Sequence, residues 1–360
     1  MSKEYRISFE CMTALLDWYR ANKRNLPWRQ NKDAYHVWVS EIMLQQTRVS
    51  AVIEYYKRFF EHFPEIAKLA HASEEELLKV WEGLGYYSRI RNMQKAAIII
   101  ESEYGGVMPL QYDLLIKLPG IGPYTAGAIS SIVGGEKAPA VDGNVLRVIT
   151  RLSGNTSNIS KPATVKEIQT QIYHFMDKHP EIIPGELNQA LMELGALVCI
   201  PNGHPQCEQC PFSPYCFAYL MNETEHIPVK EKPPKRRIEE KTLILLESSN
   251  GITLHKRPAK GLLAGMYEFP SLSGFMEEAA VLEQVKKWGY HPLRIHELED
   301  AVHIFSHIEW HMKAYLIRVD EVLDKIKWDE ANDFCFVSKE ELKHSFPLPS
   351  AFEAYRKYIN

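Results

Sequence analysis

The sequence predicts a multidomain protein in which an all-α domain is followed by a smaller α+β domain. Apolar residues recur at helical spacing up to about residue 220, and the periodicity then falls towards two. Between these regions lies NETEHIPVKEKPPKRRI, which is polar, basic and proline-bearing. We therefore predict a helical domain at 1–221, a linker at 222–238 and an α+β domain at 239–360, a division expected for a chain of 360 residues.

The helical domain is predicted to be a succession of helices separated by turns that carry glycine or proline. Apolar residues at helical spacing form a first helix from Phe9 to Tyr19, and LPWR at 26–29 ends it. Further helices are predicted at 37–44, 51–62, 74–81, 90–104, 125–133, 145–152, 165–178 and 186–198.

A Gly-x-Gly turn between two helices is the most informative motif of this domain. In LPGIGPYTA (118–126), Gly120 and Gly122 follow a short helix at about 113–118 and precede a helix that begins near Tyr124. Because glycine permits positive φ and has no side chain, N–H groups at the start of the second helix can reach a phosphate. This pattern is typical of a helix-hairpin-helix that binds the DNA backbone, although a plain helix–helix turn has the same glycines.

Two carboxylates stand in apolar surroundings. Asp142 lies in a VDGN turn directly before an apolar helix, where it also suits a simple N-cap. Glu41 lies in VWVSEIMLQQT, a helix apolar nearly all round, so we expect a buried carboxyl with a raised pKa. A satisfied core glutamate is the structural alternative. Together, an acid and a separate carboxylate suit cleavage of a glycosidic bond through an oxocarbenium-like transition state.

Four of the six cysteines crowd into 18 residues, whereas Cys11 and Cys335 are isolated. Their spacing, Cys-x7-Cys-x2-Cys-x5-Cys, is formed by Cys199, Cys207, Cys210 and Cys216. In a reducing compartment such a group predicts a metal or iron–sulfur site before disulfides. Four close thiolates suit either a [4Fe–4S] cluster or a structural zinc ion.

The α+β domain is predicted from alternating strands and turn signals. A hairpin is expected to turn at Asn250-Gly251, with strand-like runs at 266–269, 304–319 and 333–337 and helices near 277–288 and 350–358. The first residues contain no apolar core of signal-peptide length, and no stretch is long enough to span a bilayer. We therefore expect a cytosolic protein, and the net charge of −4 argues mildly against a general nucleic-acid coat protein.

Several motifs occur in the order found in one family. VSEIMLQQTRV, WEGLGYYSR, LPGIGPYTA, AVDGNV and the four-cysteine group resemble adenine DNA glycosylases of the MutY type, within the helix-hairpin-helix DNA glycosylase superfamily. The α+β domain resembles the NUDIX-like domain of that family, with GLLAGMYEFP as a matching stretch. The resemblance covers nearly the whole chain. It implies a base-excision repair enzyme that excises adenine mispaired with 8-oxoguanine and, more weakly, with guanine.

The resemblance also implies catalytic roles. Glu41 matches the acid that protonates N7 of the flipped adenine, and Asp142 matches the carboxylate that stabilises the sugar cation or forms a covalent sugar intermediate. Tyr124 and Asn144 match residues that orient these carboxylates, as a phenol and an amide can without adding charge. Related enzymes of the endonuclease III type carry a lysine at the Tyr124 position and cleave the strand through a Schiff base. Because tyrosine cannot form one, we predict base removal without an efficient lyase step.

Matching residues of the family further predict a DNA-binding and base-binding set. These residues are Trp28, Arg29, Leu44, Gln189 and Met192 for the adenine pocket, Gln46, Thr47 and Tyr86 for the opened duplex, and Phe305, Ser306 and His307 for 8-oxoguanine. The structural alternatives are core or surface positions, most seriously for Tyr86. The family resemblance favours a [4Fe–4S] cluster on the four cysteines, although the first interval, IPNGHPQ, has seven residues where the family usually has six.

The resemblance implies double-stranded DNA with 8-oxoguanine:adenine or guanine:adenine mispairs as the partner. It also implies a monomer in the bacterial cytoplasm, associated with the nucleoid and with no membrane contact. A nucleotide hydrolase is disfavoured because MEEAAVLEQVKKWGY does not supply the metal-binding Arg-Glu-x-x-Glu-Glu helix. The remaining alternatives are a thymine-directed glycosylase, a lyase of the endonuclease III type and an inactive lesion-binding protein. Glu41 argues against a thymine-directed glycosylase, and Tyr124 argues against a lyase. The presence of both Glu41 and Asp142 argues against an inactive protein.

Overall fold

The computed structural model describes residues 7–231, 234–249, 251–320, 328–329 and 332–359. The chain divides into two compact units, of which the first is Met1–His71 with Asn92–Lys232 and the second is Ala72–Arg91 with Pro233–Asn360. The first six residues, linker positions 232–233 and Asn250 lie outside the described residues, so our expectations for them stay predictions. In the described ranges, no helix has the length and apolar composition needed to cross a membrane.

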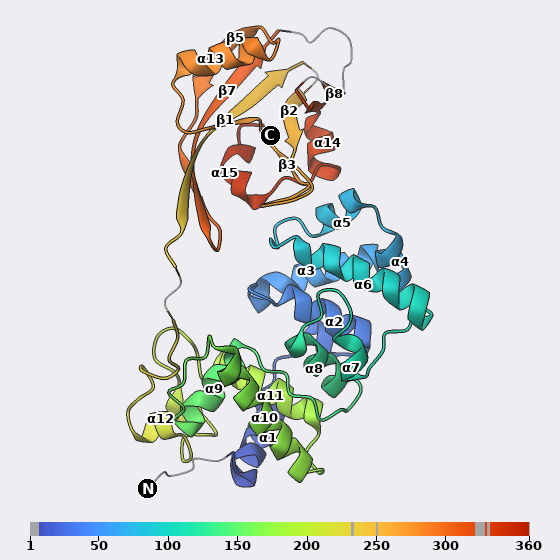
Figure 1. Cartoon of the computed structure of the whole chain (residues 1–360), viewed down its shortest axis with the longest axis vertical. Helices are drawn as coiled ribbons and strands as arrows, with labels where there is room; N and C mark the ends of the chain where they lie inside the picture. The colour runs from blue at the N-terminus through green and yellow to red at the C-terminus, as the bar shows by residue number, and fades with distance from the viewer. Residues whose placement is uncertain (1–6, 232–233, 250, 321–327, 330–331, 360) are drawn as a thin grey trace. The chain divides into compact units, whose positions relative to one another are not determined.

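The first unit is helical throughout (Figure 1). Its elements are α1 (Phe9–Asn22), η1 (Pro27–Arg29), α2 (Ala34–Met43), α3 (Val49–His62), α4 (Ile66–His71), most of α6 (Ser88–Tyr104), α7 (Tyr112–Leu115), α8 (Pro123–Ile132), α9 (Gly143–Ser153), α10 (Pro162–Lys178), α11 (Pro184–Leu197), η2 (Cys207–Gln209) and α12 (Phe217–Leu220). Each long helix that periodicity predicts is present. The helix predicted at about 113–118 is shorter, and the short α4 and α12 were not predicted.

Local chemistry fixes the ends of the helices that carry the site. Proline occupies the first turn of α8, α10 and α11, where its missing N–H costs no intrahelical bond. The side chain of Asp142 caps α9, and Gly154 ends that helix with a left-handed φ of 70°. These caps set where α8 and α9 begin, and both helix starts lead into the cavity described below.

A hydrophobic core joins α1, α9, α10 and α11 (Figure 1). Fully buried Leu15, Val145, Ile168 and Leu194 come from these four helices, respectively. Helix α11 also packs against α8, so it touches both halves of the unit. One polar residue of α11, Asn188, is buried against α8, where its Nδ2 donates to Oγ of Ser131 at 2.8 Å.

The second unit is an α+β fold that contains α5 (Glu74–Val80) and the start of α6. Its strands are β1 (Arg237–Ser248), β2 (Gly251–Lys256), β3 (Tyr267–Glu268), β4 (Ser271–Ser273), β5 (Pro292–Glu297), β6 (Ala301–Ile304), β7 (Ile308–Val319), β8 (Trp328–Asp329) and β9 (Phe334–Val337), and its helices include α13 (Glu278–Lys287), α14 (Lys339–His344), η3 (Ser350–Phe352) and α15 (Glu353–Arg356). In the described residues these strands form one mixed sheet, ordered β5-β7-β1-β2-β9-β8, in which β1 and β7 are parallel.

Successive side chains of the central strands point to opposite faces of the sheet, and both faces are apolar. Leu243 and Leu245 of β1 belong to the core that includes α15, whereas Ile244 and Leu246 belong to the core that includes α13. The strand predicted at 304–319 is interrupted, because β6 and β7 pair as a hairpin around a tip at 305–307. That tip carries the residues predicted to read 8-oxoguanine.

Candidate active site

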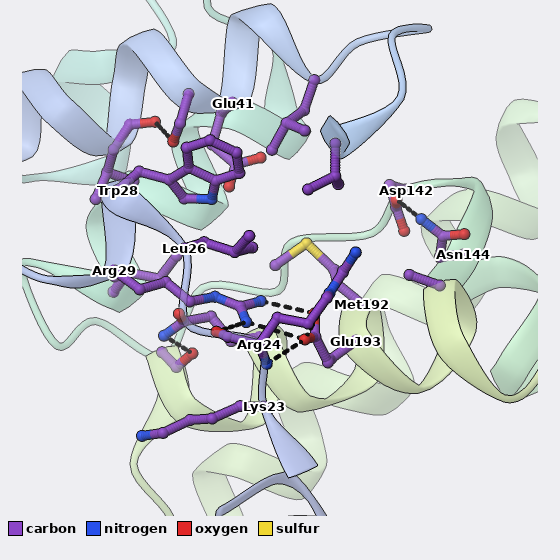
Figure 2. Close-up of a pocket in the computed structure, with 18 of the residues that line it drawn as sticks. Lys23, Arg24, Leu26, Trp28, Arg29, Glu41, Asp142, Asn144, Met192 and Glu193 are labelled. Atoms are coloured by element: carbon purple, nitrogen blue, oxygen red, sulfur yellow. Dashed lines mark hydrogen bonds and ion pairs between the residues drawn. The ribbon is translucent and has the colours of Figure 1, made fainter. Parts of the chain in front are cut away.

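A cavity of about 1120 Å³ lies in the helical unit, between α2 and α8 on one side and α9 and α11 on the other. It gathers residues that are far apart in the sequence (Figure 2). Eleven predicted site residues line it: Trp28, Arg29, Glu41, Leu44, Gln46, Thr47, Tyr124, Asp142, Asn144, Gln189 and Met192. The fold thus brings the two predicted carboxylates and the predicted base-binding residues to one place.

Glu41 is 7% exposed and lies on α2 among buried apolar neighbours. Burial raises its pKa to about 7, and the charge of Asp142 adds to the rise. A hydrogen bond from Tyr124 and the charge of Arg29 act in the opposite direction. The buried carboxyl and raised pKa expected from the sequence are therefore both confirmed, and Glu41 can be protonated near neutral pH.

Tyr124 stands in the first turn of α8, immediately after the Gly-x-Gly turn. Its hydroxyl donates a hydrogen bond to Oε2 of Glu41 and lies 3.2 Å from Sδ of Met192. Burial, followed by the Glu41 and Asp142 charges, raises the pKa of Tyr124 well above its usual value. The phenol is thus a donor to Glu41 throughout the physiological pH range.

Asp142 caps α9 and faces the cavity (Figure 2). Its Oδ1 accepts a bond of 2.8 Å from the N–H of Val145, and its Oδ2 accepts one of 2.7 Å from Nδ2 of Asn144. Burial raises the pKa of Asp142, while these bonds and the charge of Arg147 oppose the rise. Both the N-cap alternative and a cavity-facing carboxylate therefore apply to the same residue.

An ion-pair cluster that sequence reasoning did not predict closes one wall of the cavity (Figure 2). Glu193 on α11, with a side chain 1% exposed, receives paired bonds from Arg24 and Arg29 at 2.8 to 3.1 Å. Although burial raises the pKa of Glu193, these arginine bonds lower it to about 2. A glutamate inside the apolar run ALMELGAL was the available signal, since such a residue requires a buried partner.

Two buried arginines of α9 reach the four-cysteine loop. Nε of Arg147 donates to the Cys199 carbonyl at 2.7 Å, and its Nη2 donates to Oδ1 of Asn144 at 2.9 Å. Arg151 lies 3.3 Å from Sγ of Cys199, and its own carbonyl accepts a bond of 3.3 Å from the Cys216 thiol. These arginines were also missed, although their i, i+4 spacing in an apolar helix indicates buried polar contacts.

The four cysteine thiols lie close enough for the charge of the other three to affect Cys210. Burial, and then the charge on the other three thiols, raises the pKa of Cys210 to about 12. In the described ranges, no three His, Cys, Asp or Glu side chains are arranged as ligands of one metal ion. Four thiol donors from one loop suit either a [4Fe–4S] cluster or a tetrahedral zinc ion.

The Gly-x-Gly turn corrects one detail of the sequence interpretation. Gly120 has a φ of 77°, as expected, and a Cβ there would lie 2.7 Å from Cβ of Asn92. Gly122, however, has an extended φ of −92° and acts as the N-cap of α8. Nothing lies within 4 Å of a Cβ placed on Gly122. Its absent side chain therefore leaves the helix start open, and positive φ is needed only at Gly120.

The remaining predicted residues lie outside the cavity. Ser306 and His307 are exposed at the β6–β7 tip, with Oγ and Nδ1 3.1 Å apart, and Phe305 packs edge-on against Trp310 at 4.9 Å. Tyr86 is 46% exposed in the turn before α6. The core alternative for Tyr86 is therefore wrong.

Comparisons with known proteins identify the family. Residues 39–173 match the HhH-GPD superfamily of base excision DNA repair proteins, and residues 242–358 match the NUDIX domain. The adenine DNA glycosylase of Mus musculus is 36% identical over 365 residues, covering 85% of this chain and 70% of the mouse protein. That of Buchnera aphidicola (subspecies Acyrthosiphon pisum, strain APS) is 35% identical, covering 87% and 88%. The chain belongs to the adenine DNA glycosylase family.

The fold of this family extends to proteins named for other bases. A thermostable thymine-DNA glycosylase matches with a TM-score of 0.52 and 28% identity, over 58% of this chain and 95% of that one. The helical architecture is thus confirmed as that of a helix-hairpin-helix glycosylase. Because the fold alone does not set the target base, the base must be argued from the site.

Proposed function

We propose that this chain excises adenine from duplex DNA in which adenine is mispaired with 8-oxoguanine or guanine. The observation that carries the proposal is the shared cavity of Glu41 and Asp142, in which Glu41 has a pKa of about 7. Adenine is a poor leaving group until it is protonated. A carboxylic acid that holds its proton near neutral pH, next to a second carboxylate, supplies what this bond cleavage needs.

In the proposed reaction, Glu41 gives its proton to N7 of the flipped adenine, and the glycosidic bond breaks with both electrons leaving on the base. Asp142 stabilises the sugar cation by its charge or by a covalent bond. Asn144 and the N–H of Val145 hold its two oxygens, which fixes the carboxylate for this task. Water then adds to the sugar, assisted by the Glu41 carboxylate, and an abasic site remains.

Tyr124 supports a monofunctional reaction. A lyase needs an amine that attacks the sugar and forms a Schiff base, and a phenol cannot do so. Because Tyr124 donates a hydrogen bond to Glu41, we assign Tyr124 a role in setting the pKa of Glu41 instead. We therefore propose that strand cleavage is inefficient.

The adenine pocket is proposed to lie between Trp28 and the α11 face. Met192 and Leu44 supply apolar walls, and Gln189 supplies an amide that can pair with the N6 and N7 edge of adenine. Arg29 is held in place by Glu193, so its guanidinium is fixed before the base arrives. Flipping the base out of the stack costs a few kcal/mol, which a preformed pocket helps to offset.

DNA is proposed to contact three further places. The open start of α8 at Gly120 and Gly122 would bind a backbone phosphate. Gln46, Thr47 and Tyr86 would contact the opened duplex, and the exposed tip with Phe305, Ser306 and His307 would read 8-oxoguanine. A serine hydroxyl and a histidine ring can distinguish the oxidised base by its changed donor and acceptor pattern.

The four cysteines are proposed to hold a [4Fe–4S] cluster through Cys199, Cys207, Cys210 and Cys216. When bound, the cluster would tie the loop to α9, next to Arg147 and Arg151. We assign it a structural and DNA-contacting role, because a cluster that cross-links a surface loop makes that loop rigid. The seven-residue first interval contains proline and glycine, which a longer connection can accommodate.

A single-turnover assay tests the proposal. An end-labelled duplex with adenine opposite 8-oxoguanine is incubated with wild type or Glu41→Gln, and samples are analysed with and without hot alkali. We expect cleavage only after alkali, and a loss of 10²–10⁴-fold in the variant. A duplex with thymine opposite guanine serves as the control for the thymine-directed alternative. Nicking without alkali would refute the monofunctional assignment, and tight binding without abasic product would refute catalysis.

A further inference from the structure

The two residues proposed to wedge into the duplex share an unusual backbone conformation. Gln46 has a φ of 60° and Tyr86 a φ of 46°, and both side chains are exposed. Only five non-glycine residues in the described part of the chain have positive φ. Such a conformation persists only where the surroundings impose it, and it often occurs where function requires a preset geometry.

Arg89, in the first turn of α6, holds the turn that carries Tyr86. Its Nη2 donates to the carbonyls of Leu84 and Gly85 at 3.0 and 3.1 Å. The Gly85 carbonyl also accepts a bond of 3.1 Å from the indole of Trp81. Gly85 has a φ of 68°, so Gly85 and Tyr86 are two consecutive residues in the left-handed region. The guanidinium of Arg89 holds this turn through its hydrogen bonds to the backbone carbonyls.

The same guanidinium contacts two aromatic rings. The Cζ atom of Arg89 lies 5.3 Å from the ring centre of buried Trp81 and 5.6 Å from that of Tyr86. Burial lowers the pKa of Arg89 to about 10, which leaves it charged at neutral pH, so both contacts are cation–π contacts. One ring is thereby anchored in the core and the other is held at the surface.

We propose that Arg89 is a positioning residue that presets Tyr86 for insertion into the duplex beside the mispair. The inference rests on the proposed function. Arginine suits this role because its planar group binds two carbonyls while stacking on a ring, whereas lysine offers a point charge. Without Arg89, the Tyr86 ring would have to become ordered when DNA binds. The loss of side-chain conformational entropy at that step would weaken binding of the mispair.

A double-mutant cycle tests this role. Arg89→Lys, Tyr86→Ala and the double variant are made in a Glu41→Gln background, so that the duplex is not consumed. The probe is a duplex with adenine opposite 8-oxoguanine and 2-aminopurine as the neighbouring base, whose fluorescence rises when it is unstacked. We expect Arg89→Lys to weaken mispair binding about tenfold and to halve the fluorescence rise, while the same substitution adds less than twofold after Tyr86→Ala.

Arg58→Lys is the matched control, because Arg58 also stacks on a tyrosine, 4.6 Å from the ring centre of Tyr55, but outside the proposed DNA-binding set. It should change neither readout. Equal effects of Arg89→Lys with and without Tyr86 would overturn the inference, as would an unchanged fluorescence rise. If Arg89→Lys lowered the melting temperature of the protein but showed no energetic coupling to Tyr86→Ala in DNA binding, Arg89 would have a structural role only. If the Glu41→Gln parent itself showed no preference for the mispair, the proposed function would fail instead.

Discussion

Replacing Tyr124 with phenylalanine is expected to move the pH dependence of adenine excision towards alkaline pH. In the proposed reaction Glu41 acts only when protonated, so a pKa of about 7 predicts a rate plateau at acid pH and a fall of about tenfold per pH unit well above the midpoint. Tyr124 donates a hydrogen bond that lowers this pKa by favouring the carboxylate. A hydrogen bond to a charged group contributes about 1.5–3 kcal/mol.

The size of the shift follows from that bond. One pKa unit corresponds to about 1.36 kcal/mol, and part of the bond survives with the protonated acid, so we expect an upward shift of about one unit. Excision from the 8-oxoguanine:adenine duplex is measured in single turnovers from pH 5 to pH 9. The midpoint should move from about 7 to about 8.

Tyr35→Phe is the matched control, because Tyr35 is also buried in the helical unit but donates to the Phe63 carbonyl at 3.1 Å. Its pH profile should coincide with that of wild type. An unchanged midpoint in Tyr124→Phe would show that this hydrogen bond does not set the acid. A profile with no alkaline limb in wild type would refute Glu41 as the proton donor.

Four further predictions concern stability, DNA binding and the cofactor. The pKa of Glu41 is about 7 in the fold against a usual 4.5, so wild type loses up to about 3 kcal/mol of stability as pH rises through this range. Glu41→Gln should therefore have a higher melting temperature than wild type at pH 8 but not at pH 4. An equal difference in melting temperature at both pH values would contradict the conclusion that burial raises the pKa of Glu41. Gly120→Ala, with φ 77° and a contact of 2.7 Å to Asn92, should cost about 1–3 kcal/mol of stability. Gly122→Ala should keep the melting temperature yet weaken duplex binding in fluorescence anisotropy, and unchanged binding would exclude this phosphate site. Cys210→Ser should lose bound iron in a colorimetric assay and melt lower, whereas a full iron content would remove Cys210 from the ligand set.

The long helices could be predicted because their signal is local. Apolar periodicity repeats over several turns in α3, α6 and α10, and each is present within a few residues of its predicted bounds. The four-residue α12 is too short to show such a repeat, and it packs against α9. Likewise the sequence at 304–319 resembles one continuous strand, because Phe305 in the tip and Ile308 directly after it are both residue types that favour strands.

The carboxylates of the site could be predicted, but their partners could not. Glu41 stands in an apolar helix, so its burial and raised pKa follow from its neighbours in sequence. The bonds between Arg24 and Glu193 join residues 169 positions apart, and no local pattern pairs them. The extended φ of Gly122 has a similar reason, since a Gly-x-Gly sequence permits positive φ without saying which glycine uses it.

Three of the four carboxyl-bearing residues that line the cavity show how one fold can keep several acids in different states. Glu193 shares two arginines, and its pKa of about 2 keeps it charged at every physiological pH. Asp142 is partly buried, which raises its pKa, but helix N–H and amide bonds act in the opposite direction and favour its anion. Glu41 has one phenol and apolar surroundings, and its pKa rises to about 7. The proposed acid, Glu41, and the proposed cation-stabilising anion, Asp142, therefore differ in the number of hydrogen-bond donors around each carboxyl, which is why removing one donor should shift the pH dependence of the reaction.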